Sequence, residues 1–368
     1  MNAKPATLLL LLALSIPLAG AVDAKPALRI VFFTPSDVDP PEGVQPRINE
    51  IVAYTQAFFA AGLKRWGHSG QHPLAVHRTA DGAPKITYVR GQHSYESGRY
   101  KTPTFQREVI HKAAKHLGIS KKGEVWWIFL YKAAENGWGR GRGNAFSGGN
   151  STAYFYPIEG RIAPGTKMAD GLLRELKLKG AIHELGHALG LPHFGPRAID
   201  NLGNSLMGPV NKAFSGRFGP EDTRVYLGEA SAAMLAYHPL FTGIRCRSDQ
   251  LLDLQLTDLK QDQSTIRGKV SNPEAIHHVL ATSQGTASSK VPGGSYWRQA
   301  FVGKVEGDGA FQVELEELPA GKGFLKVAFC SRDGLVLGPG KRLGLDSGFT
   351  LPYTREGDTI IINEQIAP

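Results

Sequence analysis

The sequence predicts an α+β domain with a twisted sheet, followed by an all-β domain. Strand-like and helix-like segments alternate between residue 27 and about residue 242, whereas only short strand-like segments occur after residue 247. The 368 residues are enough for two domains, and 42% hydrophobic with 20% charged residues is typical of globular proteins. We therefore expect a first domain at 25–242, a second at 247–346 and a C-terminal tail at 347–368.

The first 24 residues have the pattern of a secretory signal peptide. Lys4 precedes the apolar run 6–18, and small residues then offer cleavage sites after Ala21 or Ala24. The run is shorter than the ~20 residues needed to cross a bilayer, although an uncleaved anchor remains an alternative. We expect residues 1–24 to be removed and the mature protein to be secreted or periplasmic.

Export would place the two cysteines, Cys246 and Cys330, in an oxidising compartment. A disulfide between them is then plausible, because such bonds persist outside the cytosol. Two buried free thiols are the alternative.

The elements of the first domain follow from apolar spacing. Residues 28–34 form a short apolar run that predicts the first strand of a buried sheet. Pro46 begins a helix whose apolar residues recur at helical spacing, so this helix should lie on the sheet. We expect further strands at 86–89, 124–131 and 153–157, and further helices at 102–117, about 170–190 and about 220–238.

The segment 124–131 carries the strongest strand signal, since it is apolar on both faces and is therefore expected at the centre of the sheet. Its two tryptophans, Trp126 and Trp127, are expected to pack on opposite faces of the sheet rather than to form a ligand platform.

The second domain contains short strand candidates separated by Gly, Pro, Asn and Asp. Their spacing is typical of a β-sandwich of immunoglobulin-like type. The candidates are 251–256, 264–270, 276–281, 297–305, 311–315, 324–329 and 335–337.

One segment of the first domain carries a metal-binding pattern. His183 and His187 are four residues apart, so on a helix both imidazoles lie on one face and can reach one metal ion. Glu184 lies beside the first ligand, where it can reach a water on the metal without binding the metal itself. Gly190 allows the chain to turn away, and His193 can then approach the same metal.

Three neutral imidazoles and one water give a zinc site with an open position, which is typical of catalytic rather than structural zinc. A chance match on an amphipathic helix is the alternative, but Ile182, Leu185 and Leu189 already supply the apolar face. The sequence therefore predicts one catalytic Zn²⁺ ion; whether calcium also binds is left open.

The stretch 183–193 resembles the zinc signature of the metzincin clan of secreted metalloendopeptidases, and its sequence is most similar to that of the matrixin branch. The clan has a methionine-containing turn below the metal, and Met207 stands at the corresponding place. The resemblance implies a metzincin-like catalytic domain with a twisted sheet, helices, an active-site helix and this Met-turn. Phe194 stands where several families of the clan have Ser, Thr or Asp, so the family within the clan is left open.

The resemblance also implies where an extended substrate would lie. The strand on the upper rim of the cleft would correspond to 143–149, and the wall of the pocket would follow Met207. The implied residues are Ala145, Phe146, Ser147, Gly148, Val210, Asn211 and Phe214. Ordinary surface loops are the alternative for both stretches.

Together these features predict a secreted zinc endopeptidase in which Glu184 acts as general base on protein or peptide substrates. One alternative is an extracellular binding or adhesion protein, with a catalytically idle zinc domain and a β-sandwich that holds a glycan or protein. Another is a deformylase-type amidase, although His193 and the export signal argue against it.

The remaining features argue against phosphate-binding and nucleic-acid-binding proteins. The glycine-rich stretch 137–143 could suggest a phosphate cradle, but no Lys-Ser/Thr pair follows it. The basic residues do not interleave with aromatics as on a nucleic-acid surface, so no nucleic-acid partner is expected. The net charge of +9 instead favours acidic substrates or anionic cell-surface polymers. The oligomeric state is left open.

Overall fold

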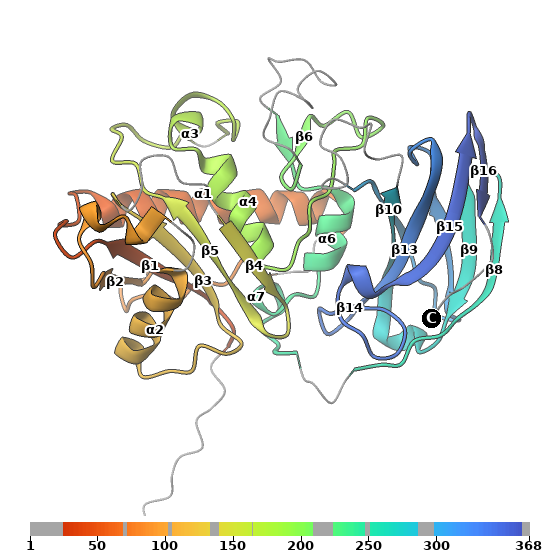
Figure 1. Ribbon diagram of the computed structural model, residues 1–368, viewed down its shortest axis with the longest axis horizontal. Helices are drawn as coiled ribbons and strands as arrows, with labels where there is room; N and C mark the ends of the chain where they lie inside the picture. The colour runs from red at the N-terminus through yellow and green to blue at the C-terminus, as the bar shows by residue number, and fades with distance from the viewer. Residues whose placement is uncertain are drawn as a thin grey trace, which may run out of the picture.

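The computed structural model describes residues 25–68, 72–101, 105–132, 140–163, 165–208, 224–246, 251–285 and 298–362. The chain forms a mixed α/β structure with several sheets (Figure 1). No helix within these ranges is both long and apolar enough to cross a membrane.

The N-terminal part is built on a five-stranded sheet with the order β2-β1-β3-β5-β4. Four strands are parallel, and the edge strand β4 is antiparallel to β5. Parallel strands need crossover connections; helices lie between β1 and β2 and between β2 and β3 in the chain, whereas β4 lies between β3 and β5. The strands are β1 (Leu28–Thr34), β2 (Ile86–Arg90), β3 (Val125–Leu130), β4 (Arg140–Asn144) and β5 (Gly148–Tyr154).

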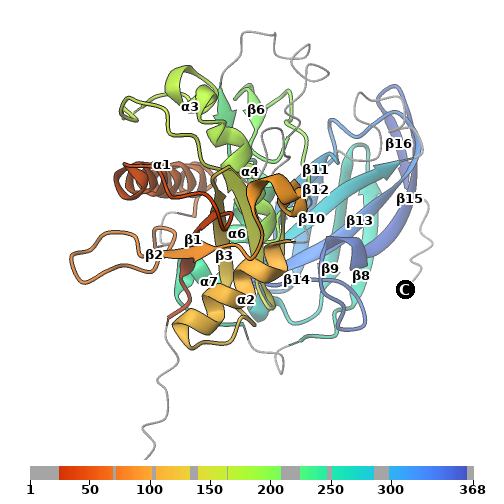
Figure 2. The same cartoon turned by 60° about the vertical axis from the view of Figure 1, so that its left-hand side comes forward.

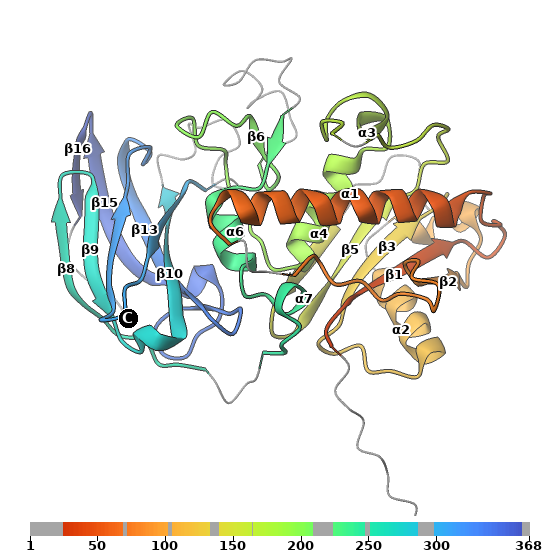
Figure 3. The same ribbon diagram turned by 180° about the vertical axis from the view of Figure 1, so that it is seen from behind.

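Helices cover both faces of this sheet. The long helix α1 (Val44–Arg65) and α4 (Leu178–Ala188) share an apolar core with one face, and α2 (Phe105–Leu117) packs on the other (Figures 2 and 3). Trp127 lies in the first core and Trp126 in the second. The prediction that these two neighbours pack on opposite faces is therefore confirmed.

The helix expected at about 170–190 is divided into two. α3 (Gly171–Glu175) begins at Asp170, whose side chain accepts a hydrogen bond from the Gly171 N–H at 2.8 Å. Lys177 then adopts a left-handed conformation with φ of 51°, and α4 follows it. The apolar spacing continues across the break because Leu176 and Leu178 are both buried, so the pattern predicted one helix.

The helix expected at about 220–238 is also shorter in the structure. Residues 224–242 contain β7 (Val225–Tyr226), paired with β6 (Asn204–Ser205), and then α6 (Glu229–Leu235) and α7 (Pro239–Thr242). Residues 220–223 lie outside the described ranges.

Two sheets form the C-terminal part and share an apolar core. One contains β11 (Ala300–Lys304), β10 (Ile276–Gly285), β13 (Gly321–Ser331), β15 (Phe349–Glu356) and β16 (Thr359–Ile362), with β14 (Val336–Leu337) paired to β13. The other contains β12 (Ala310–Glu314), β9 (Thr265–Val270) and β8 (Leu256–Asp262). Short 3₁₀ helices lie at Tyr95–Ser97, Arg99–Lys101, Pro273–Ala275 and Leu345–Ser347.

The prediction of a C-terminal tail at 347–368 requires correction, because β15 and β16 belong to the larger sheet. Phe349, Leu351 and Tyr353 alternate into the core, and Gly357 turns the chain with φ of 60°. The strand expected at 251–256 is displaced as well, since β8 starts at Leu256. The immunoglobulin-like type and the domain boundary at 242–247 stay predictions.

The two parts of the chain are in contact. The apolar core around α1 and α4 extends to residues of the C-terminal part, among them Leu280, Ala328 and Cys330. A histidine cluster lies at the same junction: His68 follows α1, and its ring centroid is 5.2 Å from that of His278 on β10. A register shift in β10 lets the neighbouring His277 approach His278, with 2.6 Å between their Nδ1 atoms.

The junction should make the protein acid-sensitive. Burial, followed by the charges of His278, His68 and Arg332, lowers the pKa of His277 below its ordinary value. Its contribution to stability is therefore present above about pH 6.5 and is lost as the pH falls below that value, by about 1.4 kcal/mol per pH unit. The free energy of unfolding can be measured by urea titration at pH 7, 6 and 5. We expect its slope against pH to be smaller by about this amount in His277→Gln.

The matched variant is His116→Gln, which changes an exposed histidine on α2. It should leave the slope unchanged. Identical pH dependence in His277→Gln and the unsubstituted protein would contradict the assignment.

Candidate metal centre

The helix α4 presents two of the three predicted ligands. Ile182, Leu185 and Ala188 are buried in the core, so the face that carries His183 and His187 points elsewhere. The two imidazole Nε2 atoms are 3.1 Å apart.

Gly190 makes the turn that the sequence predicted. Its φ is 91°, a left-handed conformation that costs glycine no steric strain, and the chain reverses after it. This reversal brings His193 to the same point, with its Nε2 atom 2.9 Å from that of His187. The prediction that residues 183, 187 and 193 come together is confirmed, and the three side chains form a group that could hold a metal ion.

Backbone carbonyls orient two of the rings. His183 Nδ1 is 2.8 Å from the Leu206 oxygen, and His187 Nδ1 is 2.7 Å from the Leu191 oxygen. A carbonyl oxygen only accepts, so each Nδ1 must carry the proton, and each Nε2 keeps a lone pair for a metal ion.

The electrostatic environment keeps these rings neutral. Burial, and then the charge of His187, lowers the pKa of His183 to about 4. Burial likewise lowers the pKa of His193 to about 3, with smaller contributions from His187, His183 and Arg298. Neutral imidazole is the form that binds transition metals.

The donor set fits a tetrahedral metal. Imidazole nitrogens about 2.0 to 2.1 Å from a tetrahedral zinc ion would be about 3.3 Å apart. The Nε2 separations of 2.9 and 3.1 Å are close to this value. Within the described residues, no other three His, Cys, Asp or Glu side chains bring their ligand atoms within 4.8 Å of one another.

The third ligand is held by the C-terminal part of the chain. Arg298 N–H donates to the His193 oxygen at 3.3 Å, and the Gly195 N–H donates to the Arg298 oxygen at 2.9 Å. Between them, the Phe194 oxygen accepts a hydrogen bond from Ser205 Oγ at 2.7 Å. No residue pattern predicts this support, because it consists mainly of backbone groups.

Met207 packs against α4, and its assignment to a Met-turn stays a prediction. It is buried, and a Cβ at Gly186 would come within 2.5 Å of its sulfur. A glycine at this position of α4 therefore makes room for the methionine.

Glu184 lies on α4 beside the histidine cluster. Burial raises the pKa of its carboxyl group to about 7, while a hydrogen bond from Gly141 N–H and the charge of Arg140 oppose the rise. A carboxyl group with this pKa can both accept and release a proton near neutral pH.

The edge strand β4 runs next to α4. Cβ atoms at Gly141 and Gly143 would overlap the backbone oxygens of Glu184 and Ala188, so only glycine allows this close approach. The far edge of β4 has no neighbouring strand among the described residues. Such an edge can pair with an extended chain.

The predicted rim residues lie just beyond this strand. Ala145, Phe146 and Ser147 form the turn of the β4–β5 hairpin, and Gly148 starts β5. Ala145 and Phe146 pack against the core of the C-terminal sheets. The edge strand is therefore Arg140–Asn144, three residues earlier in the chain than the predicted stretch.

The remaining predicted residues divide into two groups. Val210, Asn211 and Phe214 lie outside the described residues. Both cysteines are free thiols: Cys246 Sγ donates to the Asp333 oxygen at 2.6 Å, and Cys330 is buried. The disulfide considered from the sequence is therefore not formed in this structure.

Comparisons with known proteins show a similarity of fold to solved structures. No protein-family model and no curated sequence matches the chain. Among solved structures, wild-type OgpA from Akkermansia muciniphila is 19% identical, and the alignment covers 93% of this chain and 96% of OgpA with a TM-score of 0.66. A second crystal form of OgpA gives a TM-score of 0.64 at 19% identity, over 89% of this chain and 95% of OgpA.

Catalytically inactive OgpA in complex with an O-glycopeptide substrate, glycodrosocin, gives a TM-score of 0.65. The identity is 18%, and the alignment covers 92% of this chain and 95% of that one. At this identity the likeness establishes a shared fold over nearly the whole length of both chains.

Proposed function

We propose that this protein is a zinc-dependent endopeptidase. The observation that carries the proposal is the convergence of three imidazole Nε2 atoms, with Glu184 on the same helix. A purely structural metal site has no use for a carboxyl group beside its ligands on the same helix. This feature argues against a binding protein with an idle metal domain.

Zinc is the ion that suits a set of three histidines with an open fourth position. When bound, it acts as a Lewis acid that polarises the scissile carbonyl and makes water a better nucleophile. His183, His187 and His193 would hold it. Glu184 takes the proton of the attacking water and then delivers it to the leaving amine.

The substrate is proposed to be an extended peptide that adds a strand to the free edge of β4. Backbone groups supply such pairing, so it tolerates many sequences. Because OgpA, which shares the fold, was crystallised with an O-glycopeptide substrate, we propose O-glycosylated peptides as the substrate class.

The protein is further proposed to be an exported member of the metzincin clan. The supporting features are the apolar run at 6–18, the spacing of the three histidines and the place of Met207 under α4. Residues 1–24 lie outside the described residues.

The test is a cleavage profile of the full chain on matched peptides with and without an O-glycan. We expect cleavage of the glycopeptide, at least a hundredfold loss after treatment with a chelator, and recovery when one equivalent of Zn²⁺ is added. Three histidines whose Nε2 atoms converge on one point should retain one zinc ion per chain. Chelator-resistant cleavage, or zinc-loaded protein that cuts neither peptide, would contradict the proposal.

A further inference from the structure

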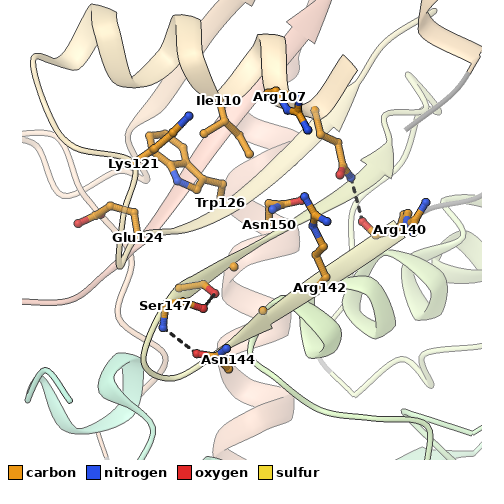
Figure 4. A pocket seen from close by; sticks show the side chains of 14 residues that line it. Arg107, Ile110, Lys121, Glu124, Trp126, Arg140, Arg142, Asn144, Ser147 and Asn150 are labelled. Carbon is orange, nitrogen blue, oxygen red and sulfur yellow. Dashed lines mark hydrogen bonds between the residues drawn. The ribbon is translucent and has the colours of Figure 1, made fainter. Parts of the chain in front are cut away.

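A groove lies on the sheet face opposite α4. Side chains from α2, the start of β3 and the β4–β5 hairpin line it (Figure 4). Its volume is about 650 Å³. Small-molecule sites commonly have volumes of about 300 to 1,000 Å³. The groove is therefore large enough for a ligand of two or three sugar rings.

The alternating sequence of β4 places its charges in this groove. Successive side chains of a strand point to opposite faces. Gly141 and Gly143 face α4, because a Cβ at either would overlap the backbone of that helix. Arg140 and Arg142 consequently point away from α4 and line the groove. The glycine-arginine stretch that did not fit a phosphate cradle thus has a structural explanation.

The groove is strongly cationic. Its positively charged residues are Arg107, Lys121, Arg140 and Arg142, and in the described part of the chain none of the four is paired with a carboxylate. Its acidic residue, Glu124, is neutralised by Arg29 at 2.5 Å and by Arg245 at 3.1 Å. The remaining charge favours an anionic ligand.

The floor contains two buried polar atoms without partners. Asn150 lies directly opposite Arg142 on one side and Trp126 on the other, in one row across β4, β5 and β3. Within the described residues, Trp126 Nε1 and Asn150 Oδ1 have no hydrogen-bond partner, and Trp126 is only 1% exposed. Such atoms are rare because they are costly, and a bound ligand can satisfy them.

We propose that this groove binds an acidic saccharide, namely a short glycan that carries a sulfate or carboxylate group. The arginines supply donors for the anionic group, and the half-buried Asn150 side chain supplies an amide for a sugar hydroxyl. The ring of Trp126 is covered, so it cannot provide the stacking surface that single-stranded nucleic acids use. Binding in this groove does not require peptidase activity.

Calorimetric titration of the full chain tests the proposal with three probes. These are a disaccharide that carries one sulfate ester, the same disaccharide without sulfate, and inorganic sulfate. We expect the sulfated disaccharide to bind at least tenfold more tightly than either of the others. Equal affinity for inorganic sulfate would overturn the saccharide assignment.

Two substitutions locate the site. Arg142→Gln should weaken binding about 10- to 100-fold, the worth of a charge-assisted hydrogen bond. Asn150→Asp keeps the shape of the side chain but places a negative charge on the floor, so it should abolish binding. Arg142 is preferred to Arg140, because Arg140 lies close enough to Glu184 to lower the pKa of that carboxyl.

Lys115→Gln is the matched control. It removes the same charge from an exposed position on α2 that does not line the groove. It should change the affinity less than twofold. If Lys115→Gln and Arg142→Gln weaken binding equally, the interaction is a general effect of net charge and the proposal fails.

Discussion

Glu184→Gln is expected to lower kcat/KM for peptide hydrolysis by about a thousandfold, within the range that general acid-base catalysis supplies. The amide has nearly the same shape as the carboxyl group, but it cannot take a proton from water at neutral pH. The three histidines are untouched, so zinc content measured by atomic absorption should stay at one ion per chain. Retention of the metal with loss of turnover separates a base from a ligand.

The matched variant is Glu175→Gln, which makes the same chemical change at an exposed position in α3. It should leave both kcat/KM and the zinc content unaltered. If Glu184→Gln hydrolyses the substrate at the rate of Glu175→Gln, another group is the base. If it loses zinc, Glu184 has a ligand role that the Nε2 geometry does not indicate.

The metal cluster could be predicted from the sequence because its geometry is local. His183 and His187 lie one helical turn apart, and Gly190 sets the reversal that brings in His193. The spacing of a few residues therefore determines where the imidazoles meet. The two carbonyls that orient them, at Leu191 and Leu206, are backbone groups and cannot be predicted from the residue types.

The bounds of the edge strand beside the cluster were harder to predict: the resemblance implies 143–149, whereas the strand is Arg140–Asn144. Strand prediction relies on alternating apolar and polar residues, and β4 alternates glycine with arginine instead. Its inward positions are occupied by helix backbone rather than by apolar side chains. A period of two was present in Gly141-Arg142-Gly143, but its meaning depended on where α4 lay.

Contacts between distant segments were the least predictable feature. The loop after His193 pairs with Arg298, a residue far along the chain, and no periodicity relates the two. The strands β15 and β16 were missed because Pro352 and the charged turn around Gly357 interrupt the apolar pattern. In the structure, tertiary pairing with β13 outweighs these local signals.

Gly141→Ala is expected to damage both stability and activity, although it adds only one methyl group. The new Cβ would overlap the Glu184 oxygen and come within 2.8 Å of His187 Cβ. Backbone atoms cannot rotate away, so β4 and α4 must separate. Overpacking of this kind costs about 1 to 3 kcal/mol, and a shift of about 1 Å in catalytic groups can cost about a hundredfold in rate.

Gly180→Ala gives a matched control, because Gly180 lies on α4, the helix that Gly141 approaches. Nothing lies within 4 Å of a Cβ at Gly180, and alanine favours a helix by about 1 kcal/mol over glycine, so this variant should unfold at the same or a higher temperature. Thermal unfolding and kcat/KM should be measured on both variants. Because the two make the same chemical change, a difference between them reports the contact between β4 and α4. Equal Tm and equal kcat/KM would mean that the strand does not hold the active helix in place.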